Sequence, residues 1–358
     1  MKTILMSGNE AMGEAAIRAG LKFYAGYPIT PQNELTACMA DQLPRRGGIF
    51  IQSESELAAI NMIYGASAAG ARVMTSSSSP GISLKQEGIS YISGAEVPAV
   101  IINVMRAGPG LGNIWPAQSD YFQATKGGGH GDYRMIVLAP ATVQESFDLT
   151  RLGFDLADRY RIAVMILSDG LLGQMMEGLT IEEPAAPVVS VAKPWALTGA
   201  RGRAPQVVQS LYMKRPDVEK HNLVLQKKYR RIAAKETRSA GRFLEDARMV
   251  VAAYGSTARI VEAVVVALRG RGMKIGLFRP VTLWPFPSRA LAALTPRVKR
   301  FLVVEMSYGQ MVEDVRLSLE GRARVDFYGR SGGGIPTEAQ VERAILKTWN
   351  ASLMRKRR

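Results

Sequence analysis

Two short stretches of this sequence combine reactive side chains with a restricted backbone. In Tyr27-Pro28-Ile29-Thr30-Pro31, two prolines fix the chain on either side of Thr30 and so hold its hydroxyl in place. Glu54-Ser55-Glu56 brings two carboxylates to the start of an alanine-rich run. The preference of acidic residues for a helix N-terminus explains at least one of them. The other remains a candidate for acid–base chemistry.

Three further stretches add hydroxyls, a cation and flexible backbone. Thr75 through Gly81 is a hydroxyl-rich turn after an apolar strand. Arg106 ends another apolar strand and is either a surface cation or an anion ligand inside a cleft. The four glycines between Thr125 and Asp132 allow the backbone to approach a ligand closely. Together at strand ends, these stretches predict one polar site with a carboxylate, an arginine and several hydroxyls.

Three glycine motifs do not support the functions they usually indicate. Gly8 through Gly13 has the glycine spacing of a P-loop, but Glu14 stands where the phosphate-binding lysine belongs. Gly108 through Gly112 lacks the third glycine of a dinucleotide-binding turn and does not follow the first strand. Gly329 through Gly333 has the pattern of a nucleophile elbow, but no histidine follows Ser331. A hydrolase of that type is therefore excluded.

Strands and helices alternate over the first half of the chain. Short β-branched runs predict strands, and segments with helical spacing between them predict helices. The strands are Thr3–Met6, Ile49–Gln52, Val73–Thr75, Ala99–Met105, Met135–Ala139 and Ala163–Leu167, and the helices are Glu10–Arg18, Leu57–Ala69 and Val143–Arg159. The pattern predicts a doubly wound parallel α/β sheet with strands buried on both faces and a ligand site at their carboxyl ends.

The alternation stops and then resumes. We predict a first domain over residues 1–182 and a linker with a basic excursion over 183–248, with a helix near Val224–Thr237. A second, smaller α/β domain covers 249–348, and a basic tail covers 349–358. The second domain is expected to contain strands Val250–Tyr254, Lys274–Phe278, Phe301–Val304 and Val325–Tyr328, and helices Thr257–Leu268, Arg289–Ala293, Gln310–Leu319 and Thr337–Thr348.

The composition is that of a two-domain protein without disulfides. Of 358 residues, 47% are hydrophobic and 22% charged, which is enough to bury a core in each domain. The single cysteine, Cys38, and two histidines cannot assemble a zinc or iron–sulfur site within this chain. No segment has the apolar length of a membrane span. We expect a cytoplasmic protein with any redox metal on another chain.

Most of the net charge of +15 lies in one segment and one tail. Residues 201–248 hold 13 basic and 5 acidic residues, and Arg355-Lys356-Arg357-Arg358 adds four positive charges. Such a patch suits an acidic protein partner, such as an electron carrier, or the phosphates of a nucleotide-like cosubstrate. The alternative is a solvated linker and a frayed terminus. Because no aromatic residues interleave with the basic run, we expect no nucleic-acid partner.

These stretches, with Arg279 through Pro285, make the sequence similar to the alpha subunits of 2-oxoacid:ferredoxin oxidoreductases. Within that family it most resembles the branched-chain 2-oxoisovalerate type. Tyr27 through Pro31 is the most specific mark, and the resemblance covers nearly the whole chain. It implies an oxidoreductase subunit with a pyrimidine-binding domain for thiamine diphosphate and a domain like the C-terminal one of transketolase. Coenzyme A would be the cosubstrate.

The resemblance also implies roles for individual residues. Glu56 would hydrogen-bond to N1′ of the coenzyme's aminopyrimidine and favour the ring form that removes the C2 proton. Glu54 is its rival, although the distance from Glu56 to Gly65-Ala66 fits the family pattern better. Thr30 would contact the carboxylate or carbonyl of the 2-oxoacid. Arg106 would pair with an anionic group of the 2-oxoacid or of coenzyme A. Residues implied to line the coenzyme are Tyr27, Pro28, Ile29, Ser78 and Ser79.

Other parts of the family's machinery are expected on other chains. The motif that anchors the diphosphate through Mg²⁺ is approached here only by Ser168-Asp169-Gly170, without a suitably spaced asparagine. The resemblance therefore implies a beta subunit that supplies the diphosphate half. It also implies a gamma subunit, a ferredoxin-like delta subunit with iron–sulfur clusters, and ferredoxin as acceptor. We expect a hetero-oligomer in which the isolated chain is inactive.

Two alternatives remain open at this point. The chain could be a non-catalytic scaffold that has kept the fold within an electron-transfer complex. It could also serve an enzyme specific for 2-oxoglutarate, pyruvate or an aryl 2-oxoacid. Ile114 and Trp115 could shape a pocket for a branched or aromatic side chain, or pack against the partner instead.

Overall fold

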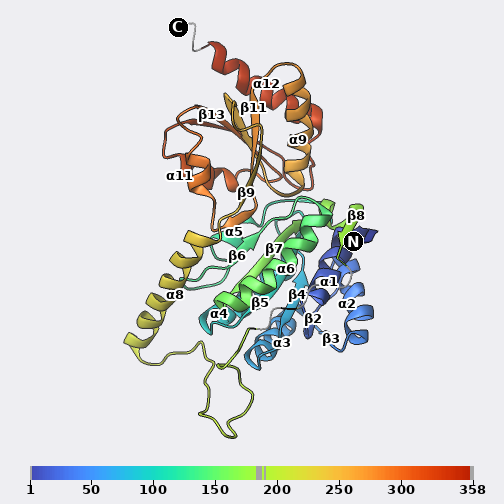
Figure 1. Cartoon of the computed structure of the whole chain (residues 1–358), viewed down its shortest axis with the longest axis vertical. Helices are drawn as coiled ribbons and strands as arrows, with labels where there is room; N and C mark the ends of the chain where they lie inside the picture. Colours follow the sequence, from blue (N-terminus) through green and yellow to red (C-terminus); the bar gives the residue numbers. More distant parts are fainter. Residues whose placement is uncertain (1, 183–187, 189–190, 355–358) are drawn as a thin grey trace.

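A computed structural model describes residues 2–182, 188 and 191–354 and shows two α/β domains joined end to end (Figure 1). Each domain is built on a largely parallel sheet with helices on both faces. The predicted fold class is therefore confirmed. Pro184 and Pro187 of the predicted linker, and the tail 355–358, lie outside the described residues. No helix in the described ranges is long and apolar enough to cross a membrane.

The first sheet has seven strands in the order β12-β6-β7-β5-β4-β2-β3. Their bounds are β2 Phe23–Gly26, β3 Ile49–Gln52, β4 Val73–Ser77, β5 Ala99–Met105, β6 Ile136–Leu138, β7 Ala163–Asp169 and β12 Thr282–Trp284. The chain runs from β2 outward to β3 and then returns to the other side of β2 as β4. This reversal between β2 and β4 is a topological switch point, where α/β sheets bind ligands beyond the carboxyl ends of their strands.

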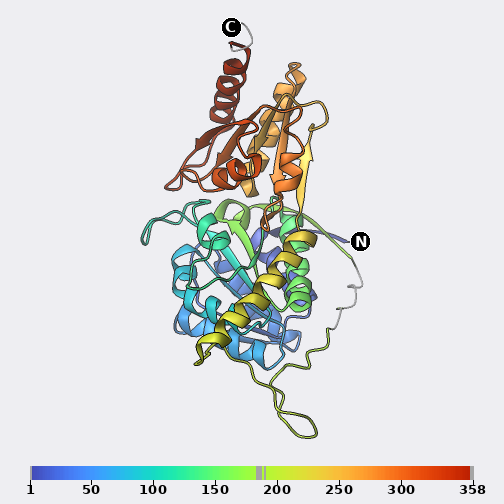
Figure 2. The ribbon, with the colours of Figure 1, turned by 90° about the vertical axis from the view of Figure 1, so that its left-hand side faces the viewer.

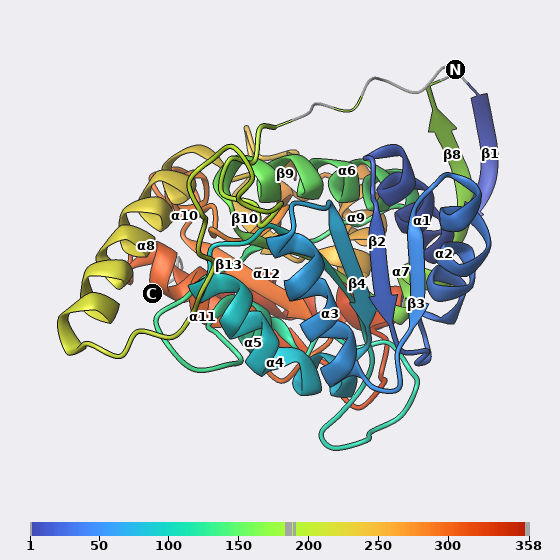
Figure 3. The same cartoon turned by 90° about the horizontal axis from the view of Figure 1, so that it is seen from below.

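Helices cover both faces of this sheet (Figure 3). Their bounds are α1 Gly8–Arg18, α2 Asn33–Arg45, α3 Glu56–Ala68, α4 Ser79–Gly94, α5 Tyr121–Thr125, α6 Val143–Tyr160 and α7 Gly170–Gln174. Helices α3 and α4 pack together on one face, and α1, α2 and α6 lie on the other. The predicted turn at Thr75–Gly81 is wrong in extent, because β4 continues to Ser77 and α4 already begins at Ser79. Pro80 suits the first turn of that helix.

The first predicted strand forms, but outside the main sheet. It is β1 (Lys2–Ser7), which pairs antiparallel with β8 (Met176–Ile181). The expectation that it is buried on both faces is wrong, since Leu5 is exposed while Ile4 and Met6 face α1 and α6. This alternation is typical of a strand that covers a core from one side. Strand β3 is likewise a half-exposed edge strand.

The second domain has a five-stranded sheet in the order β14-β13-β10-β11-β9. The strands are β9 Ser239–Arg242, β10 Met249–Ala252, β11 Ile275–Pro280, β13 Arg300–Glu305 and β14 Arg324–Gly329. The helices are α9 Gly255–Gly270, α10 Ser288–Ala292, α11 Met311–Leu319 and α12 Glu338–Met354. All four predicted strands and four predicted helices of this part of the chain are present. Strand β9 was not predicted, and it pairs antiparallel with β11.

Two segments beyond the first half of the chain complete the first domain. Helix α8 (Arg215–Lys235) lies along its side (Figure 2), and Leu225, Tyr229 and Ile232 enter its core. Lys228 of this helix donates to the Glu96 carboxylate and to the Arg161 carbonyl oxygen, both at 2.8 Å. Strand β12 pairs antiparallel with β6 at the edge of the first sheet.

The two domains meet at the carboxyl edge of the second sheet. Gln118 is fully buried there and bonds to three second-domain residues. Its Nε2 donates to the Tyr254 carbonyl oxygen at 2.9 Å, and its Oε1 accepts from Thr257 Oγ1 at 2.8 Å and from Met306 N at 3.0 Å. Tyr254 and Met306 follow β10 and β13, which flank the switch point of that sheet. The first domain therefore fills the position where the second sheet would bind a ligand.

We expect Gln118→Leu to destabilise the protein by about 3 kcal/mol, because it leaves several buried polar groups without partners. Chemical unfolding measures this change. Gln123→Leu is the matched control, since Gln123 makes a single exposed hydrogen bond to Ser83. Equal stability of the two variants would show that the Gln118 contacts do not hold the domains together.

Candidate functional site

The carboxyl edge of the first sheet brings most of the predicted residues together at its switch point. Tyr27 through Pro31 follow β2. On the neighbouring strand, Ser77 ends β4 and Ser78 is the N-cap residue of α4. Arg106 follows β5, the next strand. Glu56 opens α3, which packs against β2 and β4. The connections of the sheet therefore place a carboxylate, a guanidinium and several hydroxyls at one edge.

The two glutamates at the start of α3 differ in exposure. Ser55 is the N-cap residue, and its Oγ accepts a hydrogen bond from the Ala58 amide at 3.2 Å. Glu56 is the first helical residue and is only 5% exposed, whereas Glu54 precedes the cap and is exposed. Among the described residues, none donates a hydrogen bond to the Glu56 carboxylate. A buried carboxylate without such a donor is costly, so it calls for a polar ligand.

Gly81 lies directly against the Glu56 carboxylate. A Cβ atom at Gly81 would lie 2.5 Å from Glu56 Oε1 and 2.0 Å from Ser77 Oγ. About two turns further along α4, a Cβ at Gly88 would lie 2.5 Å from Ile60 Cγ2 of α3. The two glycines therefore let α4 approach α3 closely, and this approach encloses Glu56.

Serine hydroxyls around this carboxylate divide into free and bonded ones. Ser77 Oγ and Ser78 Oγ are buried and have no hydrogen-bond partner among the described residues. Ser79 Oγ, in contrast, donates to Asp120 Oδ2 at 2.6 Å and accepts from the Arg106 amide at 3.0 Å. Ser77 and Ser78 are thus available for a ligand, while Ser79 ties the first turn of α4 to the end of β5.

Arg106 is a buried cation without a counter-ion. Its Nη1 donates to the Thr30 carbonyl oxygen at 3.0 Å and its Nη2 to the Leu111 carbonyl oxygen at 3.1 Å. Its Nε has no partner, and no ion pair to a described carboxylate forms. Because burying an unpaired charge is unfavourable, this guanidinium favours an anionic ligand.

The loop that carries Thr30 is held through its carbonyl groups. Asn9 Nδ2 donates to the Pro31 oxygen at 2.8 Å, and the Gln32 amide donates to the Ile29 oxygen at 3.0 Å. Arg106 adds the bond to Thr30 described above. Tyr27 and Pro28 are exposed, and Ile29 and Thr30 are half-buried. Neighbouring side chains therefore fix the backbone in addition to the prolines.

Two ionisable residues near this edge, one half-buried and one fully buried, were missed in the sequence analysis. Asp120 Oδ2 accepts hydrogen bonds from Ser79 Oγ and, at 2.9 Å, from Asn103 Nδ2, and burial raises the pKa of its carboxyl group. Lys85 is fully buried on α4. Neither belongs to a recognisable motif, because their position depends on tertiary packing. Lys85 carries one sequence signal, a lysine four residues after Gly81 and hence on the same face of the helix.

Two other predicted stretches have structural roles. Gly128 and Gly129 pack on α4, where a Cβ would lie 2.4 Å from Gln86 Cδ and 2.7 Å from the Gln86 carbonyl oxygen. The close approach predicted for these glycines is thus to a helix of the same chain. Asp169 accepts from the Leu171 and Leu172 amides at the start of α7 and from Ser256 Oγ at 2.6 Å. It joins the two domains.

Large apolar side chains are exposed on segments around the site. They occur on the loop after Arg106, the loop after β2 and the neighbouring faces of α3 and α4: Leu111 (79% exposed), Trp115 (61%), Ile114, Tyr27, Leu57 and Leu84. The loop after Arg106 is closed by a bond from the Ala107 amide to the Trp115 carbonyl oxygen at 2.9 Å. Exposed apolar residues gathered in this way mark contact surfaces.

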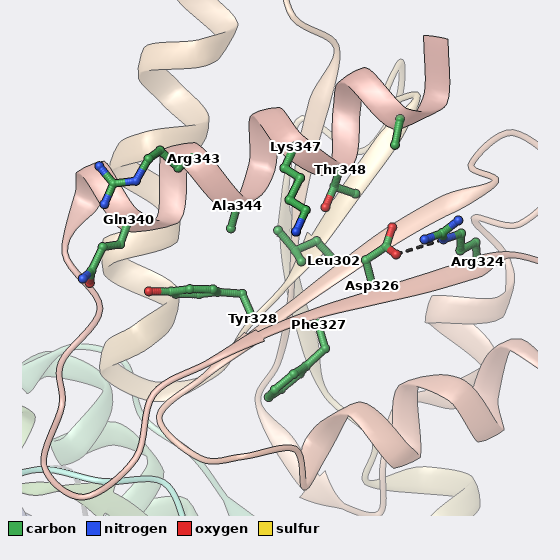
Figure 4. A pocket seen from close by; sticks show the side chains of 11 residues that line it. Leu302, Arg324, Asp326, Phe327, Tyr328, Gln340, Arg343, Ala344, Lys347 and Thr348 are labelled. Carbon is green, nitrogen blue, oxygen red and sulfur yellow. Dashed lines mark hydrogen bonds and ion pairs between the residues drawn. The ribbon is translucent and has the colours of Figure 1, made fainter. Parts of the chain in front are cut away.

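A separate cavity of about 550 Å³ lies between β14 and α12 of the second domain (Figure 4). Lys347 of α12 extends toward it, and Asp326 of β14 pairs with Arg324 at its rim. None of the residues predicted from the sequence to bind coenzyme or substrate lines this cavity.

Known families match both domains. Residues 14–240 match the thiamine diphosphate-binding region of pyruvate flavodoxin/ferredoxin oxidoreductases, and residues 247–341 match core domain II of pyruvate:ferredoxin oxidoreductase. The chain therefore belongs to the family of pyruvate flavodoxin/ferredoxin oxidoreductases. The first match includes every residue that the sequence predicts to bind coenzyme or substrate.

The sequences of related proteins align with nearly the full length of this chain. The ketoisovalerate oxidoreductase subunit VorB of Methanothermobacter thermautotrophicus is 49% identical over 94% of this chain and 95% of its own length. The 2-oxoglutarate synthase subunit KorA of the same organism is 35% identical over 96% of this chain and 98% of its own length. A solved 2-oxoglutarate:ferredoxin oxidoreductase from Magnetococcus marinus superimposes with a TM-score of 0.84 at 26% identity. The match covers 97% of this chain and 65% of that longer chain.

The residues present fit the heteroaromatic ring of thiamine diphosphate. A planar ring with several nitrogen atoms needs hydrogen-bond partners at its edge. Ser77 and Ser78 offer two buried hydroxyls without a partner among the described residues. Glu56 offers a carboxylate on a buried residue, to which no described residue donates a hydrogen bond. A side chain at Gly81 would collide with the Glu56 carboxylate and the Ser77 hydroxyl, so only backbone atoms fit at that position.

We expect Gly81→Ala to weaken thiamine diphosphate binding at least tenfold, because the added methyl group displaces the Glu56 carboxylate. Coenzyme titration of the purified complex measures this effect. Gly270→Ala is the control, since a Cβ there meets nothing within 4 Å. Unchanged affinity for Gly81→Ala would mean that the Glu56–Gly81 contact does not shape the coenzyme site.

Proposed function

We propose that this chain is the alpha subunit of a thiamine diphosphate-dependent 2-oxoacid:ferredoxin oxidoreductase. The enzyme would convert a 2-oxoacid and coenzyme A to acyl-CoA, CO₂ and a proton, and pass two electrons to ferredoxin. The observation that carries the proposal is the buried Glu56 carboxylate, which has no described donor and lies at the switch point of a thiamine diphosphate-binding domain.

Glu56 would hold the aminopyrimidine ring through N1′. A carboxylate oxygen and a neutral ring nitrogen both accept hydrogen bonds and donate none. A hydrogen bond between them therefore needs a proton that the two atoms share. The exposure of Glu54 and the burial of Glu56 support Glu56 for this role. When bound, thiamine diphosphate would supply the nucleophilic carbon, formed by loss of its C2 proton, and an electron sink for the decarboxylation.

Arg106 and Thr30 would bind the 2-oxoacid. The free Nε of Arg106 and its unpaired charge suit a carboxylate, and the half-buried Thr30 hydroxyl lies on the loop to which Arg106 is bonded. Tyr27, Pro28, Ile29, Ser78 and Ser79 are proposed to line the coenzyme, with Ser79 acting through the position of α4. Holding the acid in one orientation lowers the entropic part of the barrier to decarboxylation.

The partner chains are proposed to complete the site. A beta subunit would supply the diphosphate-binding half with Mg²⁺. A gamma subunit and a ferredoxin-like delta subunit would complete the complex, with the iron–sulfur clusters on partner chains. The exposed apolar residues around the site, with Trp115 and Leu111 most prominent, support burial of this edge against another chain. Coenzyme A would bind at the same junction.

A branched-chain 2-oxoacid is the proposed substrate. Support comes from the higher identity to the ketoisovalerate subunit, 49%, than to the 2-oxoglutarate subunit, 35%, each over nearly the whole chain. Ile114 and Trp115 on the loop after Arg106 offer apolar surface for a branched side chain. A panel of 2-oxoacids with a viologen dye as acceptor decides between this substrate and 2-oxoglutarate.

We expect Glu56→Gln to abolish 2-oxoacid oxidation by the assembled complex, because an amide cannot share the N1′ proton in the same way. Glu54→Gln is the matched control and should retain most activity. Dye reduction with saturating coenzyme measures both. Full activity of Glu56→Gln together with loss in Glu54→Gln would move the role to Glu54. Full activity of both variants would favour the scaffold alternative.

We expect Arg106→Met to raise the KM for the 2-oxoacid by about tenfold to a hundredfold. This factor corresponds to the free energy lost with one charge-assisted hydrogen bond. Arg134→Met is the control, since Arg134 also donates to two backbone carbonyls but lies away from the site. Steady-state kinetics at fixed coenzyme measures both. If the KM for the 2-oxoacid stays unchanged and that for coenzyme A rises instead, Arg106 binds the cosubstrate.

A further inference from the structure

The cavity of about 550 Å³ between β14 and α12 has no role in the proposed reaction. Sites for small organic ligands have volumes of this order. Strand β14 ends the second sheet, so no further strand fills the space beside it. On α12, the short side chains of Ala344 and Ala351 line this space, whereas Val341 and Ile345 on the neighbouring stripe are fully buried in the core. The short side chains therefore leave the cavity open (Figure 4).

Two cations of α12 border the cavity without a counter-ion. Arg343 and Lys347 are exposed, and neither pairs with a described carboxylate, since the nearby Glu342 is paired with Arg271 of α9 at 2.6 Å. Residues four apart on a helix are neighbours, so these two like charges repel each other. The helix dipole does not account for them, because neither lies in the last turn of α12. An anion bound between them would offset the repulsion.

Asp326 of β14 adds an acceptor that lacks a donor. Its Oδ1 accepts from Arg324 Nε at 2.9 Å, whereas its Oδ2 is buried and has no hydrogen-bond partner among the described residues. Arg300 Nη1 lies 3.9 Å from this Oδ2, close enough for an ion pair but too far for a hydrogen bond. A buried acceptor of this kind suits a hydroxyl group of a ligand.

The charges around the cavity favour a ligand with both an anionic group and hydroxyls. Arg300, Arg324, Arg343 and Lys347 contribute four positive charges and Asp326 one negative charge, which leaves a net charge of +3. A phosphate group can accept hydrogen bonds from an arginine and a lysine together. It cannot satisfy the Asp326 oxygen, because that oxygen needs a donor. A phosphate attached to a sugar supplies both.

We propose that this cavity binds a small organic phosphate that carries hydroxyl groups, such as a phosphorylated ribose. The phosphate would lie between Arg343 and Lys347, and a hydroxyl would donate to Asp326 Oδ2. Tyr328, two residues further along the same face of β14, offers an aromatic surface for the sugar or an attached base. The proposal does not depend on Glu56, because no residue proposed to bind the coenzyme lines the cavity.

Calorimetric titration of the purified complex with ribose 5-phosphate, inorganic phosphate and ribose separates the two contacts. We expect ribose 5-phosphate to bind at least tenfold more tightly than either of the other two, because only it reaches both the cations and Asp326. Affinity for ribose 5-phosphate no higher than for inorganic phosphate would overturn the proposal. AMP and coenzyme A carry the same group, and the tightest binder identifies the source as a free sugar phosphate, a nucleotide or the cosubstrate.

Variants locate the binding. Lys347→Met should weaken the binding of ribose 5-phosphate and of inorganic phosphate about tenfold, the factor for one charge-assisted hydrogen bond. Arg316→Met is the matched control, since Arg316 is an exposed cation on α11 of the same domain and does not line the cavity. Ala344→Leu fills the cavity and should abolish the binding of ribose 5-phosphate.

Asp326→Ala tests the hydroxyl contact. It should weaken the binding of ribose 5-phosphate but not that of inorganic phosphate, and equal effects on both would overturn the assignment of Asp326. If this variant does not fold because Arg300 loses its partner, Lys347→Met and Ala344→Leu decide, since neither removes a buried charge. Unchanged affinity for ribose 5-phosphate in both of these variants would place its binding elsewhere on the complex and overturn the proposal.

Discussion

The close packing of α4 on α3 is the contact on which the candidate site depends. Glycines at 81 and 88 let the α4 backbone approach the Glu56 and Ile60 side chains of α3 closely, so the first carboxylate of α3 lies against that backbone. The Ser77 and Ser78 hydroxyls are buried at the same end of α4 without a partner among the described residues. Removing polar groups from water without giving them partners costs stability, which a ligand would restore on binding. The site is therefore prepared for a polar ring before any ligand arrives.

The second domain supports this edge without forming a ligand site at its own switch point. Gln118 and Asp169 of the first domain bond to residues that follow or begin the elements at the carboxyl edge of the second sheet. Strand β12 in turn extends the first sheet beside β6. Because each domain contributes to the other's structure, the loop after Arg106 is held between them, with Asn113 Nδ2 donating to the Gly332 carbonyl oxygen at 3.1 Å. Arg106 and its loop are thus fixed from both sides.

The sequence predicts most of the fold but only part of the site. The buried strand Ala99–Met105 is found at its exact bounds, since its short length and β-branched residues favour a strand over a helix. Helix α4 was missed because its serine- and glycine-rich start is also typical of a turn. The choice between Glu54 and Glu56 stayed open because burial, which separates them, depends on packing against Gly81. Lys85, Asp120 and Gln118 could not be found, since each matters only through residues distant in sequence. The glycines at 128 and 129 were misinterpreted, because tight backbone contact with a helix and with a ligand need the same residue type.

Exchange of the C2 hydrogen of thiamine diphosphate for deuterium, followed by quenched-flow NMR on the assembled complex, tests the central claim most directly. It reports activation of the coenzyme without substrate, electron acceptor or coenzyme A. If the Glu56 carboxylate shares its proton with N1′, exchange in Glu56→Gln should be at least a hundredfold slower than in the parent, at saturating coenzyme. Exchange at the parent rate in that variant would contradict the account.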